Sequence, residues 1–150
     1  MSIMNKAMYA VGGMEFTVET RVRGDFDEVV EFVIETLEDE GMGIQADLDP
    51  GNGIQQNIDE EFPNYRILGA CALEYAYEAL STDKRMGAMM PCNMVVYEDD
   101  ETDEIVVRGV DTQRVLPVTG NSELQHLADE ISEVFETVLD RVDEEFESVE

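Results

Sequence analysis

The chain has 150 residues, of which 36 are acidic and 9 are basic, so its formal net charge at pH 7 is −27. A domain of this length buries roughly 70% of the surface that its unfolded chain would expose, so a core can form without disulfide bonds. Apolar residues make up 43% of the chain and fall into periodic stretches, which argues against intrinsic disorder and favours one globular domain.

Acidic side chains are spread along the whole chain and are not collected in one tail. At about 1 M salt the Debye length falls to roughly 3 Å, so salt would screen most of the repulsion between them. The composition therefore predicts a protein adapted to a salt-rich cytoplasm, as in a halophilic archaeon. The sequence has no cluster of Lys and Arg with interleaved aromatic residues, which argues against nucleic-acid binding.

The sequence contains no apolar run of 18 residues and no convincing signal peptide, so we expect neither a membrane span nor export. Cys71 and Cys92 are the only cysteines, too few for the disulfide framework of a secreted protein. We therefore predict a cytoplasmic protein with reduced thiols. Residues 1–13 are expected to form a flexible N-terminal segment, and residues 14–150 a single domain.

The first predicted elements are a strand and a helix. Residues 14–23 alternate between apolar and polar side chains, as in a strand with one buried face. Asp25 precedes apolar residues at helical spacing from Phe26 to Leu37, and Glu28 completes an N-terminal capping pattern. The helix is expected to end at the glycines that follow.

The middle of the chain alternates between predicted strands and helical segments. These elements are a strand over 44–48, one or two helical turns over 54–62, a strand over 65–71 and a helix over 72–80. Pro50 and the two glycines that follow it are expected to break the chain between the first two elements. Cys71 falls at the junction of the second strand and its helix.

The last third is predicted to contain a hairpin and a long helix. Strands over 90–98 and 104–110 are joined by an acidic turn. An amphipathic helix is expected to begin with Ser122 and Gln125 as a capping box, leaving residues 143–150 frayed. This order of elements predicts an α+β fold, in which helices pack on one face of an antiparallel or mixed sheet.

Most catalytic signatures are missing from the sequence. His126 is the only histidine, so neither a histidine metal site nor a Ser-His relay can be assembled, and we expect a solvated helix residue. The segment Gly51-Asn52-Gly53 lacks the third glycine of a dinucleotide loop. With 36 carboxylates, no acid and base pair can be chosen by spacing.

The two thiols carry the most distinctive chemistry. Cys71 precedes a predicted helix, whose positive N-terminal end would lower the thiol pKa and make Cys71 a candidate nucleophile. Cys92 shares one face of its predicted strand with Met90 and Met94, and such soft sulfur ligands suit Cu(I) or another thiophilic ion if Cys71 comes close. The alternatives are that all these residues simply fill the core, or that the cysteines form a disulfide.

Two polar residues interrupt apolar runs. Arg66 must pair with a carboxylate or reach solvent. Two roles remain possible for its guanidinium group, a structural ion pair and recognition of an anionic ligand. On a regular strand its side chain points to the face opposite that of Cys71. Asn93 lies between Cys92 and an apolar segment and also needs partners, which its own backbone neighbours can supply.

Two stretches of the sequence resemble a known family. Tyr65-Arg66-Ile67-Leu68-Gly69-Ala70-Cys71 and Pro91-Cys92-Asn93-Met94-Val95-Val96-Tyr97-Glu98 are similar to the signature stretches of the domain of unknown function 302 family, and the resemblance spans about residues 14–112. It implies an α+β domain with a fold similar to that of the TATA-binding protein, commonly paired as a homodimer. Family members often carry Asn-Pro after the first cysteine, where this chain has Ala72-Leu73.

Three functions remain open from the sequence. The leading hypothesis is a domain that binds a small ligand near Tyr65, Arg66, Cys71, Cys92 and Asn93, or a soft metal ion through Cys71, Cys92 and Met90. The second is a thiol-dependent redox or sulfur-handling enzyme with Cys71 as its nucleophile. The third is an interaction module whose long last helix provides the partner surface.

Overall fold

The computed structural model describes residues 15–149, which form a six-stranded antiparallel sheet with the strand order β2-β3-β4-β5-β1-β6. The strands are β1 (Thr17–Arg23), β2 (Gly43–Leu48), β3 (Tyr65–Cys71), β4 (Cys92–Glu98), β5 (Ile105–Val110) and β6 (Glu147–Ser148). The helices are α2 (Phe26–Asp39), α3 (Pro50–Ile58), α4 (Leu73–Thr82), α5 (Thr112–Val115) and α6 (Gln125–Glu145), with 3-10 helices η1 (Lys84–Met89), η2 (Leu116–Thr119) and η3 (Ser122–Leu124). The predicted N-terminal segment 1–13 lies outside the described residues.

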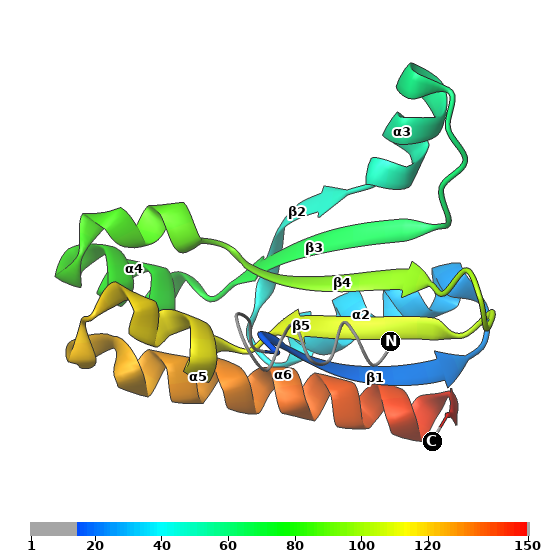
Figure 1. The fold of residues 1–150 in the computed structure, drawn as a ribbon. Helices are drawn as coiled ribbons and strands as arrows, with labels where there is room; N and C mark the ends of the chain where they lie inside the picture. The colour runs from blue at the N-terminus through cyan, green and yellow to red at the C-terminus, as the bar shows by residue number, and fades with distance from the viewer. Residues whose placement is uncertain (1–14, 150) are drawn as a thin grey trace.

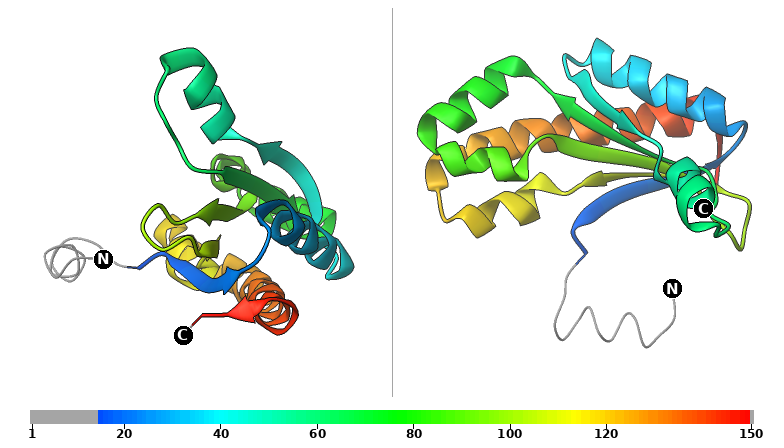
Figure 2. Two further views of the ribbon diagram at one scale, coloured as in Figure 1. Left: turned by 90° about the vertical axis from the view of Figure 1, so that its right-hand side faces the viewer. Right: turned by 90° about the horizontal axis from the view of Figure 1, so that it is seen from above.

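Helices α2 and α6 lie side by side on one face of the sheet (Figures 1 and 2). The main hydrophobic core fills the space between these helices and the strands. This arrangement confirms the predicted α+β class. The sheet is antiparallel throughout, because every strand pair in the described part of the chain runs in opposite directions.

Helix α2 begins and ends as its sequence predicts. The Asp25 carboxylate accepts a hydrogen bond of 3.1 Å from the backbone N–H of Glu28, which satisfies one of the free donors at the helix start. At the other end Gly41 has a φ of +88°, and the N–H of Met42 donates to the carbonyl of Leu37 over 2.9 Å. This glycine-centred C-cap turns the chain toward β2 and directs Met42 into the core.

Helix α6 buries one face along its whole length. Its buried residues are Leu127, Ala128, Ile131, Ser132, Phe135, Val138, Leu139 and Val142. Gly109 of β5 makes room for this helix, since a Cβ atom there would lie 2.8 Å from Cδ2 of Phe135. The apolar face of the long helix is therefore used inside the domain.

Two helix starts differ from the sequence prediction. Helix α3 begins at Pro50, four residues earlier than predicted, because the Asp49 carboxylate accepts from the N–H of Asn52 and proline is well suited to a first helical position. The predicted capping box of Ser122 with Gln125 does not form. Asn121 caps the short helix η3 instead, through a 3.0 Å bond from the N–H of Glu123.

The C-terminal residues are ordered by pairing with β1. Strand β6 pairs antiparallel with the end of β1, and the N–H of Val149 donates to the carbonyl of Arg21 over 2.9 Å. The prediction that residues 143–150 are frayed is therefore wrong for residues up to 149. Residues 112–119 also form short helices, α5 and η2, that the sequence pattern did not predict.

The two ends of the sheet are covered differently. Helices α4, η1 and α5 gather at one end, whereas α3 and the turn between β4 and β5 lie at the other (Figure 1). Strand β3 runs from one end to the other, and it carries both Tyr65 and Cys71. None of the helices in the described part of the chain is long and apolar enough to cross a membrane.

Candidate functional site

A small apolar cavity of about 40 Å³ lies at the α4 end of the sheet. Its walls come from the ends of β3 and β4, from α4 and η1, and from the start of α6. The lining residues are Met42, Ala70, Cys71, Ala72, Tyr75, Ala76, Ala79, Met86, Met89, Met90, Cys92, Leu116, Leu124, Leu127 and Ile131. We call it the sulfur cavity, because both cysteines and four of the nine methionines line it.

Strand pairing brings the two cysteines to the same cavity. Ala70 pairs with Cys92 across β3 and β4, and Cys71 follows Ala70 directly, so the two thiols come from neighbouring strands. Both cysteines are free and half-buried. The sequence left open whether Cys71 and Cys92 come close; in the structure both line this cavity, and no disulfide joins them.

Burial disfavours the thiolate form of both cysteines. It raises the pKa of the Cys71 thiol, although Cys71 lies one residue before the capping position of α4. Burial, with a smaller contribution from the neighbouring Cys71, raises the pKa of Cys92 to about 11. The direction is opposite to the one expected from the helix end, because loss of water around the sulfur disfavours the thiolate.

Four methionines complete the sulfur cavity. Met89 and Met90 come from the end of η1 and the residue after it, Met86 is buried in η1, and Met42 is the buried residue that follows the α2 cap. The sequence pattern identified Met90 alone among these four. Met94, which was expected on the same face as Cys92, lies in the main core and not at the cavity.

The donors around the cavity are almost entirely sulfur atoms. No group of three or more His, Cys, Asp or Glu side chains that could hold a metal ion occurs among residues 15–149. A metal bound here would therefore depend on thiolate and thioether ligands, which prefer soft ions. No His, Asp or Glu side chain is among the residues that line this cavity.

The remaining predicted ligand residues lie elsewhere. Arg66 is held across β2 and β3 by Asp47, with Nε donating to Oδ1 over 2.7 Å and Nη2 pairing with Oδ2. Because successive strand residues point to opposite faces, Asn93 faces away from Cys92, and it is exposed. The structure thus favours the structural ion pair for Arg66 and separates Asn93 from the thiols.

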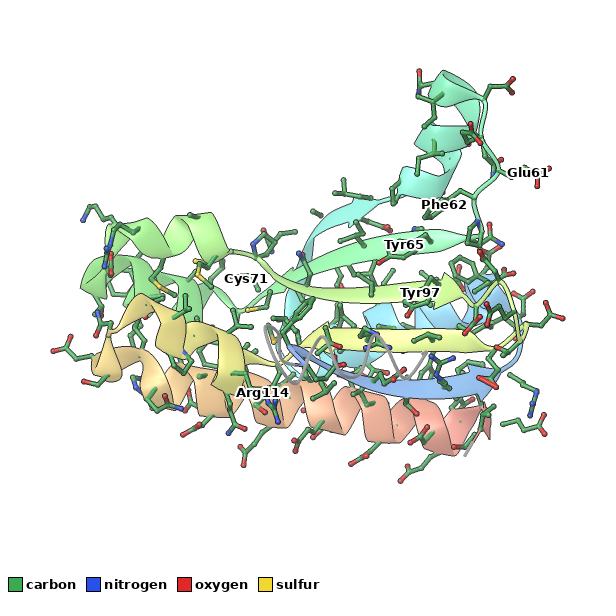
Figure 3. All side chains as sticks on the ribbon, viewed as in Figure 1. Glu61, Phe62, Tyr65, Cys71, Tyr97 and Arg114 are labelled. Carbon is green, nitrogen blue, oxygen red and sulfur yellow. The ribbon has the colours of Figure 1, made fainter. Side chains whose placement is uncertain are left out.

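Tyr65 lies at the opposite end of β3 from Cys71 (Figure 3). The strand between them has seven residues, which corresponds to about 20 Å from end to end. The Tyr65 ring stacks on that of Tyr97, with centroids 5.1 Å apart and planes inclined by 8°. Tyr65 therefore belongs to a second region, away from Cys71 and Cys92.

His126 is exposed at the start of α6, as predicted. Its Nε2 atom lies 2.6 Å from a carboxylate oxygen of Glu78 on α4. This contact joins two helices beside the sulfur cavity but does not line it.

The fold is similar to that of a solved structure. The crystal structure of an uncharacterized conserved DUF302 protein from Bacillus stearothermophilus superimposes with a TM-score of 0.79 and 21% sequence identity, covering 85% of this chain and 98% of that chain. No curated protein sequence matches the chain. Residues 18–142 match the family described as "Domain of unknown function DUF302", so the chain belongs to this family.

Proposed function

We propose that the protein binds a soft metal ion, Cu(I), in the sulfur cavity. The observation that carries the proposal is the convergence of Cys71, Cys92 and four methionines on one enclosed apolar space. Thiolates and thioethers are the soft ligands that suit thiophilic ions, Cu(I) among them. A purely structural core would need only apolar volume, which leucine and isoleucine supply without reactive sulfur.

The size of the cavity supports an ion over a small organic ligand, the two ligand classes that the sequence left open. A cavity of about 40 Å³ has room for one ion or a few water molecules. Organic ligands ordinarily occupy pockets of about 300–1,000 Å³. The dimensions therefore support a single ion at this place and not a small organic molecule.

Charge also favours a monovalent ion. A Cu(I) ion bound to one thiolate is electrically neutral, which suits apolar walls that cannot solvate a net charge. Zn²⁺ would need both thiolates for neutrality and usually takes two further Cys, His or carboxylate ligands. No such set exists among the described residues.

The raised thiol pKa values fit metal binding better than nucleophilic catalysis. A catalytic thiol must be a thiolate near neutral pH, whereas the Cys92 pKa is about 11 and that of Cys71 is also raised. A bound cation would replace the thiol proton, so binding should release protons and strengthen as the pH rises. These properties support a binding role more than the thiol-dependent enzyme.

The test is a titration of the reduced protein with Cu(I) under anaerobic conditions, in competition with a chromophoric Cu(I) chelator. We expect one Cu(I) per chain, weaker binding in Cys71→Ser and in Cys92→Ser, and loss of binding in the double variant. Met90→Leu should weaken binding by about 10-fold, because it removes one thioether while keeping the apolar volume. Met94→Leu is the matched control, since Met94 is fully buried but does not line the cavity.

Two results would overturn the proposal. One is substoichiometric Cu(I) binding by the native chain, and the other is binding that persists unchanged in the Cys71→Ser/Cys92→Ser double variant. Zn²⁺ serves as the comparison ion, and the affinity of each ion is measured against its own competing chelator. If the protein binds Zn²⁺ more tightly than Cu(I), the cavity is a thiolate site for Zn²⁺ and the proposal of a Cu(I) site with thioether ligands is wrong.

We also propose, from the composition and the family resemblance, that the protein is cytoplasmic and adapted to high salt. We propose further that it forms a homodimer and that its fold is similar to that of the TATA-binding protein. Sedimentation in about 0.2 M and about 2 M salt tests the oligomeric state and its salt dependence, since screening of the −27 charge should favour association at the higher salt.

A further inference from the structure

An open groove lies at the Tyr65 end of β3, the end opposite the sulfur cavity, and its lining is aromatic and acidic. Its residues are Glu61, Phe62, Pro63, Tyr65, Tyr97, Glu98, Asp99, Asp100 and Glu101, and its volume is about 410 Å³. We call it the aromatic groove. Three of its labelled side chains, Phe62, Tyr65 and Tyr97, lie together in Figure 3, with Glu61 beyond them.

Aromatic rings form the floor of this groove. Tyr65 and Tyr97 pair directly across β3 and β4, and their rings stack as described above. The Phe62 ring adds to this pair, with its centroid 6.0 Å from that of Tyr65 and its plane tilted by 57°. All three residues are half-buried, so part of the ring surface faces the groove.

The sides of the groove are acidic and contain no cation. Asp99 pairs with Arg21 over 2.9 Å, and Glu98 accepts a 2.6 Å hydrogen bond from Asn64. Among the described contacts, Glu61, Asp100 and Glu101 form no salt bridge. The groove therefore carries uncompensated negative charge above an aromatic floor.

The guanidinium groups of Arg21 and Arg108 are paired with carboxylates, although Nε of Arg108 is buried without a hydrogen-bond partner. Arg21 contacts Glu19, Asp99 and Glu104, and these contacts involve three carboxylates for one cation. Arg108, which acts electrostatically on Tyr65, contacts both Glu15 and Glu19. An anionic ligand would therefore find no available cation in this region, whereas a cationic ligand would be attracted.

The carboxylates are dispersed and do not converge on one point. They come from two separate segments, the loop before β3 and the β4–β5 turn, and they form no group that could hold a metal ion. A second groove of about 1,000 Å³ shares Glu61, Phe62 and Asp100 and extends the acidic lining to Asp59 and Glu60. A compact ion cannot contact such an extended set, but a long flexible molecule can.

We propose that the aromatic groove binds a flexible organic polycation, with two or more ammonium groups joined by methylene segments. The ring faces would hold one ammonium group and its neighbouring methylenes through cation–π attraction and apolar contact. Glu61, Asp100 and Glu101 would pair with the other ammonium groups. This inference is independent of the sulfur cavity, which lies about 20 Å away along β3.

Calorimetric titration of the full chain with spermidine tests the proposal, at about 0.1 M salt and again at about 1 M. We expect one spermidine per chain and weaker binding at the higher salt. Tyr97→Leu should weaken binding by about 5-fold or more because it removes one ring, while Tyr97→Phe should retain most of the affinity. The second variant shows whether a loss comes from the ring or from general disruption.

The matched controls separate a local site from the general acidity of the protein. Glu61→Gln/Asp100→Asn should weaken spermidine binding by about 10-fold. Glu31→Gln/Glu38→Gln removes the same charge from exposed positions on α2 and should change binding by less than about 2-fold. Equal losses in the two double variants would overturn the proposal, because they would indicate a diffuse counterion effect.

Two further probes define the ligand class. Mg²⁺ at matched ionic strength should not displace spermidine, and tetramethylammonium should bind much more weakly because it has one charge and no chain. Displacement by Mg²⁺ at equal concentration, or tighter binding of tetramethylammonium than of spermidine, would also overturn the proposal.

Discussion

The two ends of strand β3 have opposite chemical environments. At the Cys71 end, α4, η1 and the start of α6 enclose an apolar cavity with sulfur-bearing walls. At the Tyr65 end the strand leaves the cover of these helices, and half-buried rings lie beneath acidic loops. One strand of seven residues therefore connects an enclosed region with an open one.

The difference lies in which elements cover the strand ends. A second hydrophobic cluster, made of Ala79, Met86, Leu124 and Leu127, closes the sulfur end. The aromatic end is lined instead by loop and turn residues that carry carboxylates. Substitutions at the sulfur end should therefore affect both stability and binding, whereas those at the aromatic end should affect binding more than stability.

The largest expected effect comes from removing part of the cavity wall. Leu124→Ala should lower the free energy of unfolding by about 3 kcal/mol, because Leu124 is 1% exposed and the change enlarges an existing cavity. Phe62→Ala at the aromatic end should cost about 1 kcal/mol, since its ring is half-exposed in the native state. Urea unfolding of both variants measures the difference, and equal losses would contradict the comparison.

A pH effect specific to the sulfur end is expected next. The native Cys92 pKa is about 11, above the ordinary value of 9.0, so between these values the folded chain keeps a proton that the unfolded chain has released. This contribution is fully present below pH 9 and is lost as the pH rises through 11, by up to about 3 kcal/mol.

Urea unfolding at pH 8 and pH 10.5, for the native chain and for Cys92→Ala, measures this contribution. Other groups titrate in the same range, so the relevant quantity is the difference between the two proteins. The loss of stability with rising pH should be smaller in Cys92→Ala. An identical pH dependence would mean that the thiol is not buried in solution.

Periodicity predicted the elements that bury one continuous face. The alternation in β1, the helical spacing in α2 and the apolar run of β3 all matched the structure, and Tyr65–Cys71 matched to the residue. The short helices α5 and η2 were missed, because eight residues with a proline give no clear period. The start of α3 was missed because a proline can either end a strand or begin a helix.

The candidate site was predicted in part, for a physical reason. The sequence singled out Cys71 and Cys92 but could not tell whether they approach each other, because the pairing of β3 with β4 decides that. Met42, Met86 and Met89 come from separate segments that only the tertiary fold brings to one cavity. Tyr65 was placed with the thiols because it is close in sequence, although an extended strand carries it about 20 Å away.

A glycine near the middle of β3 offers a way to disturb the sulfur end alone. A Cβ atom on Gly69 would lie 2.5 Å from Cγ of Pro91, so Gly69→Ala must shift the segment that carries Met90 and Cys92. We expect a loss of about 1–2 kcal/mol and weaker Cu(I) binding. Spermidine binding should be unchanged, because Tyr65 and Tyr97 pair at the other end of the strand. Reduced binding at both sites would show that the ends are coupled through the strand.

The smallest effect is expected between the two ends, at Arg66. Its ion pair with Asp47 is partly exposed, with 25% and 32% of the two side chains accessible, so a double-mutant cycle with Arg66→Gln and Asp47→Asn should give a coupling of about 0.5–1 kcal/mol. The coupling should decrease in molar salt, because screening weakens partly exposed pairs. Neither Cu(I) nor spermidine affinity should change, since Arg66 lines neither the sulfur cavity nor the aromatic groove. A loss of either affinity in Arg66→Gln without a loss of stability would instead make Arg66 a ligand residue, and the two ends of β3 would then act as one site.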